Sequence, residues 1–208
     1  MALDRESVVR TALRLLDQVG LYGLTLRKLA TELGVRAPAL YWHFKNKQEL
    51  LDEMATTVFA DSIREFGMPD ESRLWSEWVM EYGKTLRRTL LRYRDGAKMF
   101  SGTYLTDPSM YAPMEAALRK LTRDGFSLSD AVNGLATIYY YVVGFTIEEQ
   151  AVYPSPGERN ELYDPARREA RIDHQKFPLA LAAGEHSFQN FDQRFEHGLQ
   201  IIVSGMRR

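Results

Sequence analysis

Cationic and aromatic side chains are concentrated between positions 25 and 47, and they are the residues with the clearest capacity for chemistry. They supply hydroxyl, imidazole, guanidinium, ammonium and large ring groups: Thr25, Arg27, Arg36, Tyr41, Trp42, His43, Lys45 and Lys47. Such groups make most of the contacts that proteins form with DNA phosphates and base edges. We therefore interpret the group as a DNA-binding surface. The alternative for the rings is the core of a small helical bundle, which is where we place Phe44.

The charge of the chain is unevenly distributed. Residues 1–47 contain eight basic and four acidic residues, a net charge of +4, whereas the rest of the chain contains 19 basic and 24 acidic residues, a net charge of −5. A basic segment on an acidic body is the pattern expected when only that segment meets phosphates. The distribution supports the DNA-binding interpretation, although the net charge of the whole chain is only −1.

The patterns that catalysis and metal binding require are missing from the sequence. The four histidines form no His-x-x-x-His or His-Glu-x-x-His pattern, no glycine-rich phosphate loop is present, and cysteine is absent. Glu148 and Glu149 are helix-end acids in this interpretation, rather than a catalytic pair. We predict a protein that is not an enzyme and that has no cofactor and no metal site.

The sequence also indicates where in the cell the protein is located. No stretch approaches the ~20 consecutive apolar residues that cross a bilayer. The segment Met1–Glu6 carries acids where a signal peptide has a basic and then an apolar run. Together with the absence of cysteine, these features favour a soluble cytoplasmic protein with no membrane partner.

Apolar residues spaced three and four positions apart run through nearly the whole chain and predict an all-α protein. Residues 1–47 are predicted to form a three-helix DNA-binding domain, with a first helix that ends at Gly20. Residues 48–208 are predicted to form a larger helical domain for ligand binding and dimerisation. A helix over residues 48–66 would connect the two domains.

Three further expectations concern the body of the chain. Asn46 and Glu49 resemble a capping box at the start of the connecting helix. Residues 154–178 are rich in Pro, Arg, Glu and Asp, and we expect a long, partly mobile excursion there. A final helix is expected to begin near Ser187.

Two short helices joined by a tight turn are predicted within the N-terminal domain. Gly34 supplies a residue that tolerates positive φ in the turn, and Pro38 fits the first turn of the second helix. Apolar residues on both helices would pack together: Leu26, Leu29, Leu33, Val35, Leu40 and Phe44. This packing would fix the angle between the helices, so that the second could enter a major groove while the first braces across the backbone.

The same segment resembles the DNA-binding domain of the tetracycline-repressor family. The resemblance is carried by Thr25–Ala30, Leu33–Val35 and Leu40–Lys47, and it is highly specific. Two segments of the body, Leu90–Lys98 and Gly125–Leu128, are also similar to the tetracycline repressors themselves. The resemblance covers nearly the whole chain. It implies a ligand-responsive transcriptional regulator, most simply a repressor, that binds a palindromic operator in double-stranded DNA as a dimer.

The resemblance implies roles for individual residues at the DNA. Arg27 would contact a base or a nearby phosphate, and the phosphate-holding residues would be Thr25, Tyr41 and Lys47. Trp42 and His43 would reach the groove.

The positions that meet base edges are occupied by Ala37, Pro38 and Ala39. The tetracycline repressors carry polar side chains where the two alanines stand. Because alanine offers only an apolar surface, for example to a thymine methyl group, we expect a different operator. Its recognition would depend more on Arg27, on His43 and on DNA shape.

Two apolar stripes in the body are candidates for a dimer interface. On the longest predicted helix the stripe is Leu128, Ala131, Leu135, Ile138 and Val142. On the last helix it is Phe188, Phe191, Phe195, Leu199 and Ile202. Intramolecular core is the plain alternative for both. The resemblance implies that these helices pair with their copies in a four-helix bundle, and a two-fold dimer matches a palindrome.

The body has more aromatic and methionine residues than core packing alone requires. We predict a large, mostly apolar cavity for a small-molecule effector, lined by Trp78, Tyr82, Leu86, Met99, Phe100, Tyr104, Met114, Tyr139, Tyr140, Phe145 and Glu148. Three consecutive tyrosines on one helix cannot all face the same way, so some of Tyr139–Tyr141 must line something other than the core. The alternative for each residue is core or dimer interface.

Tetracycline is not the expected effector. Tetracycline repressors hold a magnesium–drug chelate through a histidine, and Phe100 stands at that position. Tyr104 replaces a cation, while Tyr82 and Leu86 replace polar residues that anchor the drug. Glu148 matches an acidic position, but one carboxylate does not make a magnesium site. We predict an aromatic or hydrophobic effector bound without a metal.

Ligand binding is expected to tilt the fourth helix, whose start carries the DNA-binding domain. Tilting would change the separation of two domains that read half-sites about one helical turn apart. Two alternatives remain open: a regulator controlled by a partner protein that binds the aromatic residues, and an activator rather than a repressor.

Overall fold

The computed structural model describes residues 4–155 and 157–206, and every regular element in these ranges is helical. The α-helices are α1 (Arg5–Gly23), α2 (Leu26–Glu32), α3 (Ala37–Tyr41), α4 (Lys47–Phe66), α5 (Trp75–Leu91), α6 (Gly96–Phe100), α7 (Tyr111–Arg123), α8 (Leu128–Val152), α9 (Pro165–Glu169), α10 (Pro178–Ser187) and α11 (Phe191–Gly205). Two 3₁₀ helices are η1 (Pro108–Met110) and η2 (Glu161–Tyr163). None of the described helices is long and apolar enough to span a membrane. The prediction of an all-α chain is confirmed.

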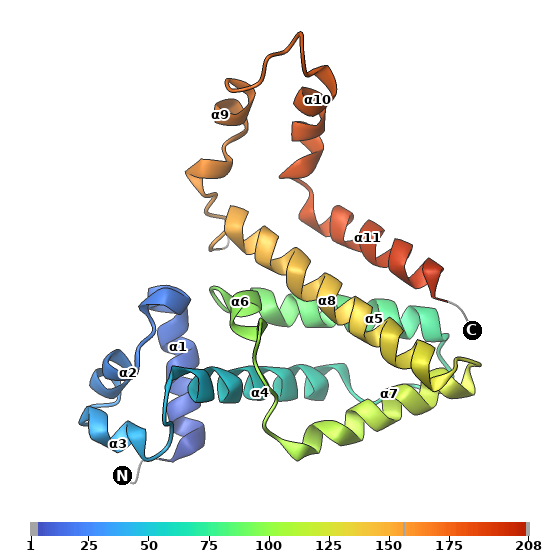
Figure 1. The fold of residues 1–208 in the computed structure, drawn as a ribbon. Helices are drawn as coiled ribbons and strands as arrows, with labels where there is room; N and C mark the ends of the chain where they lie inside the picture. The colour runs from blue at the N-terminus through green and yellow to red at the C-terminus, as the bar shows by residue number, and fades with distance from the viewer. Residues whose placement is uncertain (1–3, 156, 207–208) are drawn as a thin grey trace.

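Helices α1, α2 and α3 gather at one end of the molecule and form a unit that we call the head, residues 4–46 (Figure 1). The first helix begins where Asp4 Oδ1 accepts a hydrogen bond from Ser7 N at 2.8 Å. The sequence predicted that this helix ends at Gly20; the regular helix does break there, and one further turn continues it to Gly23. Gly20 takes φ 67° and kinks the helix, and Leu24 N then donates to Gly20 O at 3.0 Å to close a last turn. Glycine allows this kink because it has no Cβ to oppose a positive φ.

The turn between α2 and α3 has the predicted geometry. Gly34 lies in the left-handed region at φ 67°, and α3 carries Pro38 in its first turn. Leu29, Leu40 and Phe44 are completely buried in the core of the head. The packing that fixes the angle between the two helices is therefore confirmed.

Helix α4 starts in the head and runs into the body (Figure 1). Glu49 N donates to Asn46 Oδ1 at 2.9 Å, and Lys45 N donates to Glu49 Oε2 at 2.8 Å. This is the predicted capping box, with the reciprocal hydrogen bond made by the residue before the cap. The cap fixes the start of α4 against the head.

The head and the body also meet at the end of α1. Leu21 N donates to Asp95 Oδ2 at 2.9 Å, and Lys47 Nζ donates to Leu21 O at 2.6 Å. Arg94 N donates to Asp17 Oδ1 at 2.9 Å in the same turn. Both backbone polar atoms of Leu21 are thus held, one by the turn before α6 and one by the start of α4.

Helices α5, α8 and α11 pack together as the centre of the body. Close approach is possible because Gly83 has no side chain: a Cβ there would lie 2.8 Å from Leu199 Cδ2. A buried ion pair joins α5 to α8, with Arg87 Nε and Nη2 donating to the two carboxylate oxygens of Glu149 at 2.8 and 2.6 Å. Two parallel hydrogen bonds of this kind fix the orientation of both partners.

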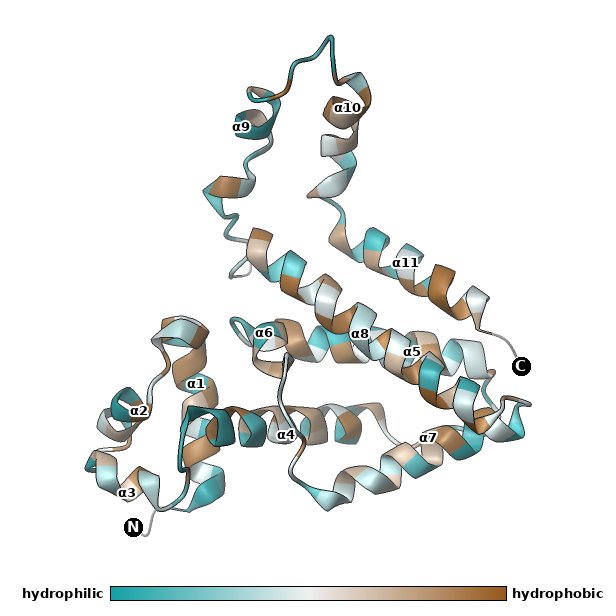
Figure 2. Cartoon of the chain, viewed as in Figure 1, coloured by the Kyte–Doolittle hydropathy of each residue, from teal (hydrophilic) through white to brown (hydrophobic). Residues whose placement is uncertain are grey.

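Residues 154–155 and 157–190 form an arm that projects away from the bundle (Figure 1). The predicted excursion over 154–178 contains η2 and α9, and the sequence analysis missed α10. The final helix begins at Phe191 rather than near Ser187, because Asn190 takes the left-handed conformation (φ 53°) and separates α10 from α11. Hydrophobic residues occur along α10 of the arm (Figure 2), and the apolar side chains of Leu162 and Leu179 are exposed.

Candidate DNA-binding and effector sites

The two rings that the sequence analysis assigned to DNA are exposed in the structure. Trp42 is 90% exposed and Tyr41 is 56% exposed, whereas Leu40 and Phe44 beside them are completely buried. The core alternative is therefore excluded for both rings within a single chain. An exposed tryptophan is uncommon on a free surface, and here it follows directly after α3.

The other predicted DNA-binding residues surround α2 and α3. Thr25 caps α2 by accepting a hydrogen bond from Lys28 N at 3.2 Å. The remaining exposed members are Arg27, Arg36, Pro38 and Lys45, and the half-buried ones are Ala37, Ala39, His43 and Lys47. All of these residues lie on α2, on α3 or on the segments that flank these helices, or at the start of α4.

Lys47 has a structural partner in addition to its predicted phosphate contact. Its ammonium group donates to Leu21 O at 2.6 Å, and partial burial lowers the pKa of Lys47. A phosphate contact by this residue remains a prediction.

The sequence analysis missed a role for Arg5. Its guanidinium lies 4.4 Å above the centre of the Phe44 ring, donates to His43 O at 2.5 Å and pairs with Glu53 at 3.1 Å. Arg5 therefore positions the backbone that follows Trp42. Its only sequence signal was its contribution to the positive charge of residues 1–47.

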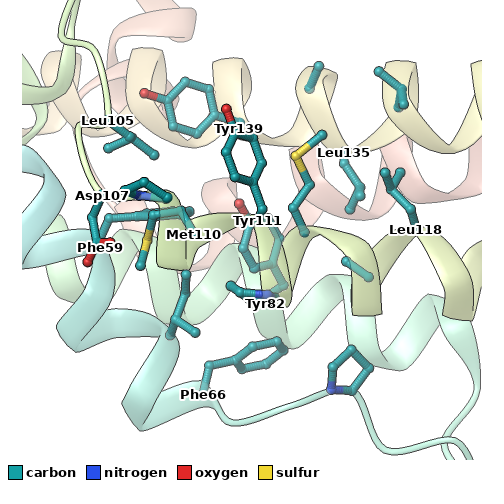
Figure 3. A pocket seen from close by; sticks show the side chains of 18 of the residues that line it. Phe59, Phe66, Tyr82, Leu105, Asp107, Met110, Tyr111, Leu118, Leu135 and Tyr139 are labelled. Carbon is teal, nitrogen blue, oxygen red and sulfur yellow. The ribbon is translucent and has the colours of Figure 1, made fainter.

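The body contains a cavity of about 510 Å³ between α4, α5, α7, α8 and the segment that joins α6 to α7 (Figure 3). Phe66 on α4 and Tyr139 on α8 approach it from opposite sides. The lining is Phe59, Ile63, Phe66, Gly67, Pro69, Trp78, Tyr82, Phe100, Tyr104, Leu105, Thr106, Asp107, Pro108, Met110, Tyr111, Pro113, Met114, Ala117, Leu118, Val132, Leu135, Ala136 and Tyr139. Its size and mostly apolar lining fit a drug-sized ligand.

The cavity includes six of the predicted ligand-binding residues: Trp78, Tyr82, Phe100, Tyr104, Met114 and Tyr139. The prediction was wrong for Leu86 and Met99, which are each 1% exposed and belong to the core. It was also wrong for Tyr140, Phe145 and Glu148. These three line a separate hollow between α8 and the start of α11, because they lie on a different face of α8 from Tyr139.

Many lining residues were missed by the sequence analysis. Phe59, Ile63 and Phe66 come from α4, which was treated only as a connecting helix. Their spacing of four and three residues could have identified an inward stripe. Apart from Tyr104, the lining residues of the α6–α7 segment carry no periodic pattern from which they could have been predicted.

The polar groups of the cavity are few. The stacked rings of Trp78 and Tyr82 have centroids 6.2 Å apart. Trp78 Nε1 is buried and has no hydrogen-bond partner among the described residues. Burial raises the pKa of Tyr82 and of Tyr139, so both phenols stay neutral at ordinary pH.

The two stripes assigned to the dimer interface are largely internal to one chain. Ile138, Val142, Phe191, Phe195 and Leu199 are buried between α5, α8 and α11, so that part of the prediction is corrected. A three- and four-residue spacing identifies a buried face, but not the chain that buries it.

The other members of the stripes have different positions. Leu135 lines the cavity. Phe188 precedes α11 and packs on Tyr163, with ring centroids 5.5 Å apart. Leu128 is 61% exposed and Ile202 is half-buried, so these two are available to a partner.

A magnesium site like that of the tetracycline repressors does not fit this chain. Phe100 occupies the cavity at the position where the resemblance implies a histidine, and its ring packs on Phe59. Glu148, the one matching acid, is exposed and lies outside the cavity. Within residues 4–155 and 157–206, no three His, Cys, Asp or Glu side chains gather closely enough to hold a metal ion.

Comparison with known proteins identifies the family of the chain. Residues 8–54 match the model for bacterial regulatory proteins of the tetR family, and residues 68–208 match the tetracyclin repressor-like C-terminal domain. The class A tetracycline repressor protein from transposon 1721 of Escherichia coli is 40% identical over 210 residues, which cover 99% of this chain and 91% of that protein.

Two solved structures are also similar. A possible TetR family transcriptional regulator from Streptomyces coelicolor A3(2) has a TM-score of 0.85 and 35% identity, with 98% of each chain covered. The class A TetR in complex with 5a,6-anhydrotetracycline and magnesium has a TM-score of 0.71 and 37% identity, with 99% of this chain and 100% of that chain covered. The exposed head, the internal cavity and these likenesses lead to one conclusion: the chain belongs to the tetR family of transcriptional regulators.

Proposed function

We propose that this DNA-binding transcriptional regulator is a repressor that binds a palindromic operator as a homodimer. An aromatic or hydrophobic effector would fill the cavity of the body and release the protein from DNA. The observation that carries the proposal is that one rigid helix, α4, lines the cavity at one end and holds the head at the other. Because such a regulator must reach its DNA target, we propose that it is located in the cytoplasm. We also propose that it has no catalytic activity.

Helix α4 provides a direct mechanical link. Phe59, Ile63 and Phe66 lie in the cavity lining, and the capped start of the helix carries Lys47, which holds Leu21 of the head. A ligand that pushes on the three lining residues would tilt α4 and move the head with it. Coupling between two sites is typically ~1–3 kcal/mol, which is enough to change operator occupancy.

A second link passes through α6. Phe100 lines the cavity at the end of this short helix, and Asp95 at its start accepts the hydrogen bond from Leu21 N. A ligand that displaces Phe100 would therefore act on the same residue of the head that α4 holds. The two links together favour a rigid-body movement of the head.

The effector would be bound without a metal ion. Phe100 offers a ring where a metal-held drug needs a ligand atom, and Phe59 supports that ring from α4. The polar groups of the lining include phenols and an indole N–H, which bind carbonyl or hydroxyl groups of an organic molecule. The buried Trp78 Nε1 would gain its missing acceptor from such a ligand.

The dimer would use the faces of α8 and α11 that one chain leaves open. Apolar side chains on these faces are Leu128 (61% exposed), Tyr140 (70%) and Ile201 (61%). Exposed apolar residues on neighbouring helices are typical of an interface core. Each subunit would then present one head to one half of the palindrome.

The test is a fluorescence-anisotropy titration of the purified protein against DNA from upstream of its own gene, at two salt concentrations. The titration is then repeated with a panel of aromatic compounds. We expect tight, salt-sensitive binding that one compound relieves. The matched variants are Ala117→Phe, which would fill the cavity, and Ala112→Phe, which lies on the same helix outside the lining.

Ala117→Phe should abolish the response to the compound while DNA binding persists, and Ala112→Phe should keep both. The absence of DNA binding at every salt concentration would contradict the proposal. DNA binding that no compound relieves would instead favour control by a partner protein, for which Tyr104 and Tyr111 at the rim are exposed by 72% and 69%.

A further inference from the structure

The described lining of the effector cavity carries a negative charge and no positive charge. Among the described residues that line it, the exposed Asp107 is the one charged side chain, and none is a lysine, an arginine or a histidine. Eight of the lining residues are aromatic. The cavity thus combines ring faces, whose centres are negative, with one carboxylate.

Local structure keeps the Asp107 carboxylate ionised and in place. Its Oδ1 accepts a hydrogen bond from Ser109 N at 2.8 Å and caps η1, which lowers the pKa of Asp107. The segment that carries it is tied to two more acids of α4. Tyr104 N donates to Asp52 Oδ1 at 3.0 Å, and Thr106 Oγ1 donates to Glu53 Oε2 at 3.0 Å.

We propose that the effector is an aromatic compound with a positive charge, such as a protonated or quaternary amine. The charge would face Asp107 and the aromatic body would lie among the rings. Cations are attracted to ring faces, whereas an anion would lose its hydration and find no cation in the lining. This inference rests on the proposed function, because it names the class of ligand for the same cavity.

Three acridines with one ring skeleton and different charges provide the test. At pH 7.5 9-aminoacridine is a cation, acridone is neutral and acridine-9-carboxylate is an anion. Binding to the full chain is measured by titration calorimetry without DNA, because acridine cations intercalate into duplexes. We expect 9-aminoacridine to bind more tightly than acridone, and at least about tenfold more tightly than the carboxylate.

Asp107→Asn isolates the charge. Asparagine is an equally good cap, so η1 should keep its geometry. We expect binding of 9-aminoacridine to weaken about three- to fivefold, as for a solvent-accessible ion pair, and binding of acridone to stay unchanged. Asp70→Asn is the matched control, because Asp70 Oδ1 accepts from Ser72 N at 2.9 Å in a similar turn outside the cavity lining.

The outcomes separate the two proposals. Equal binding of all three acridines, or tightest binding of the carboxylate, overturns the charge inference while the cavity function stands. The same holds if Asp107→Asn leaves the preference for the cation intact. A different result would overturn both proposals. It is that none of the three acridines binds, and that the compound panel releases Ala117→Phe from DNA as readily as it releases the unmodified chain.

Discussion

Trp42 in the head and Trp78 in the body illustrate two opposite uses of aromatic side chains in one chain. Trp42 is 90% exposed and follows the recognition helix α3, with Lys45 close after it in the sequence. Trp78 is 5% exposed and stacks on Tyr82 in a cavity where Asp107 is the one charged residue among the described lining residues. The exposed ring of Trp42 is thus followed by a cation in the sequence, whereas the rings of the cavity share their lining with the carboxylate of Asp107.

The difference shows that residue type alone does not assign an aromatic group to a partner. A ring beside cations suits the polyanionic surface of DNA, and an enclosed ring without cations suits a neutral or positively charged organic ligand. The two regions should therefore respond differently to mutation, to salt and to pH, and each difference can be measured.

The largest expected difference concerns stability. Phe44 is completely buried in the head, and Phe44→Ala should lower the free energy of unfolding by about 3–5 kcal/mol. Phe66 borders the cavity and is only half-buried, so Phe66→Ala should cost clearly less. Urea unfolding of both variants measures the two values. Equal losses would mean that the cavity is packed like the core of the head.

The next effect concerns base recognition. Arg27→Ala removes an exposed guanidinium at the start of α2 and should weaken operator binding by about 1–3 kcal/mol while it relaxes sequence preference. Arg119→Ala, an exposed arginine of α7, should leave DNA binding unchanged. Competition titrations with operator and random DNA measure both properties. A uniform loss across sequences would reassign Arg27 to phosphate contact.

A smaller effect separates the two roles of Lys47. If its ammonium leaves Leu21 O to hold a phosphate, Lys47→Ala should reduce the slope of log affinity against log salt by about 0.9. Lys84→Ala, on α5 and paired with Glu196, is the control. A weaker affinity with an unchanged slope would show that Lys47 acts only as a tether for the head.

The smallest effect is a pH dependence that is specific to the cavity. Burial raises the pKa of Tyr82 in the folded protein, so above pH ~10 the phenol ionises first in the unfolded chain. Stability should then fall by up to about 1.4 kcal/mol per pH unit from this group. Tyr82→Phe should remove that part of the decline. Urea unfolding between pH 8 and 11, with the head variant Tyr41→Phe as control, checks the result.

The head was predictable from sequence because its signals are local. Gly34 in the turn and Pro38 in the first turn of α3 lie a few residues apart, and the apolar spacing around them fixes which side chains are buried. The cavity has no such continuity. Its lining comes from α4, α5, α7, α8 and the α6–α7 segment, so the residues that were found are those with a matching family position, a large ring or a methionine side chain.

The errors in the body have physical causes. Ile138 and Leu199 show the apolar spacing of an interface, but the same chain already buries them. Helix α10 was missed because Pro178–Ser187 is a nearly uniform run of small and apolar residues without a polar face. Periodicity identifies a helix that is buried on one side, and it is silent about a helix on a projecting arm.

The attachment of Leu21 sets a condition for exchanging heads among regulators of this kind. A grafted head would have to present the same peptide group to Asp95 and Lys47. It would also need glycine at position 20, since a Cβ there would lie 2.9 Å from Asp95 Oδ2 on a backbone at φ 67°. We expect chimaeras that keep Gly20 and Leu21 to transmit the effector signal to a foreign operator. Those that lose Gly20 would bind DNA without responding, so this joint limits the modularity of the protein.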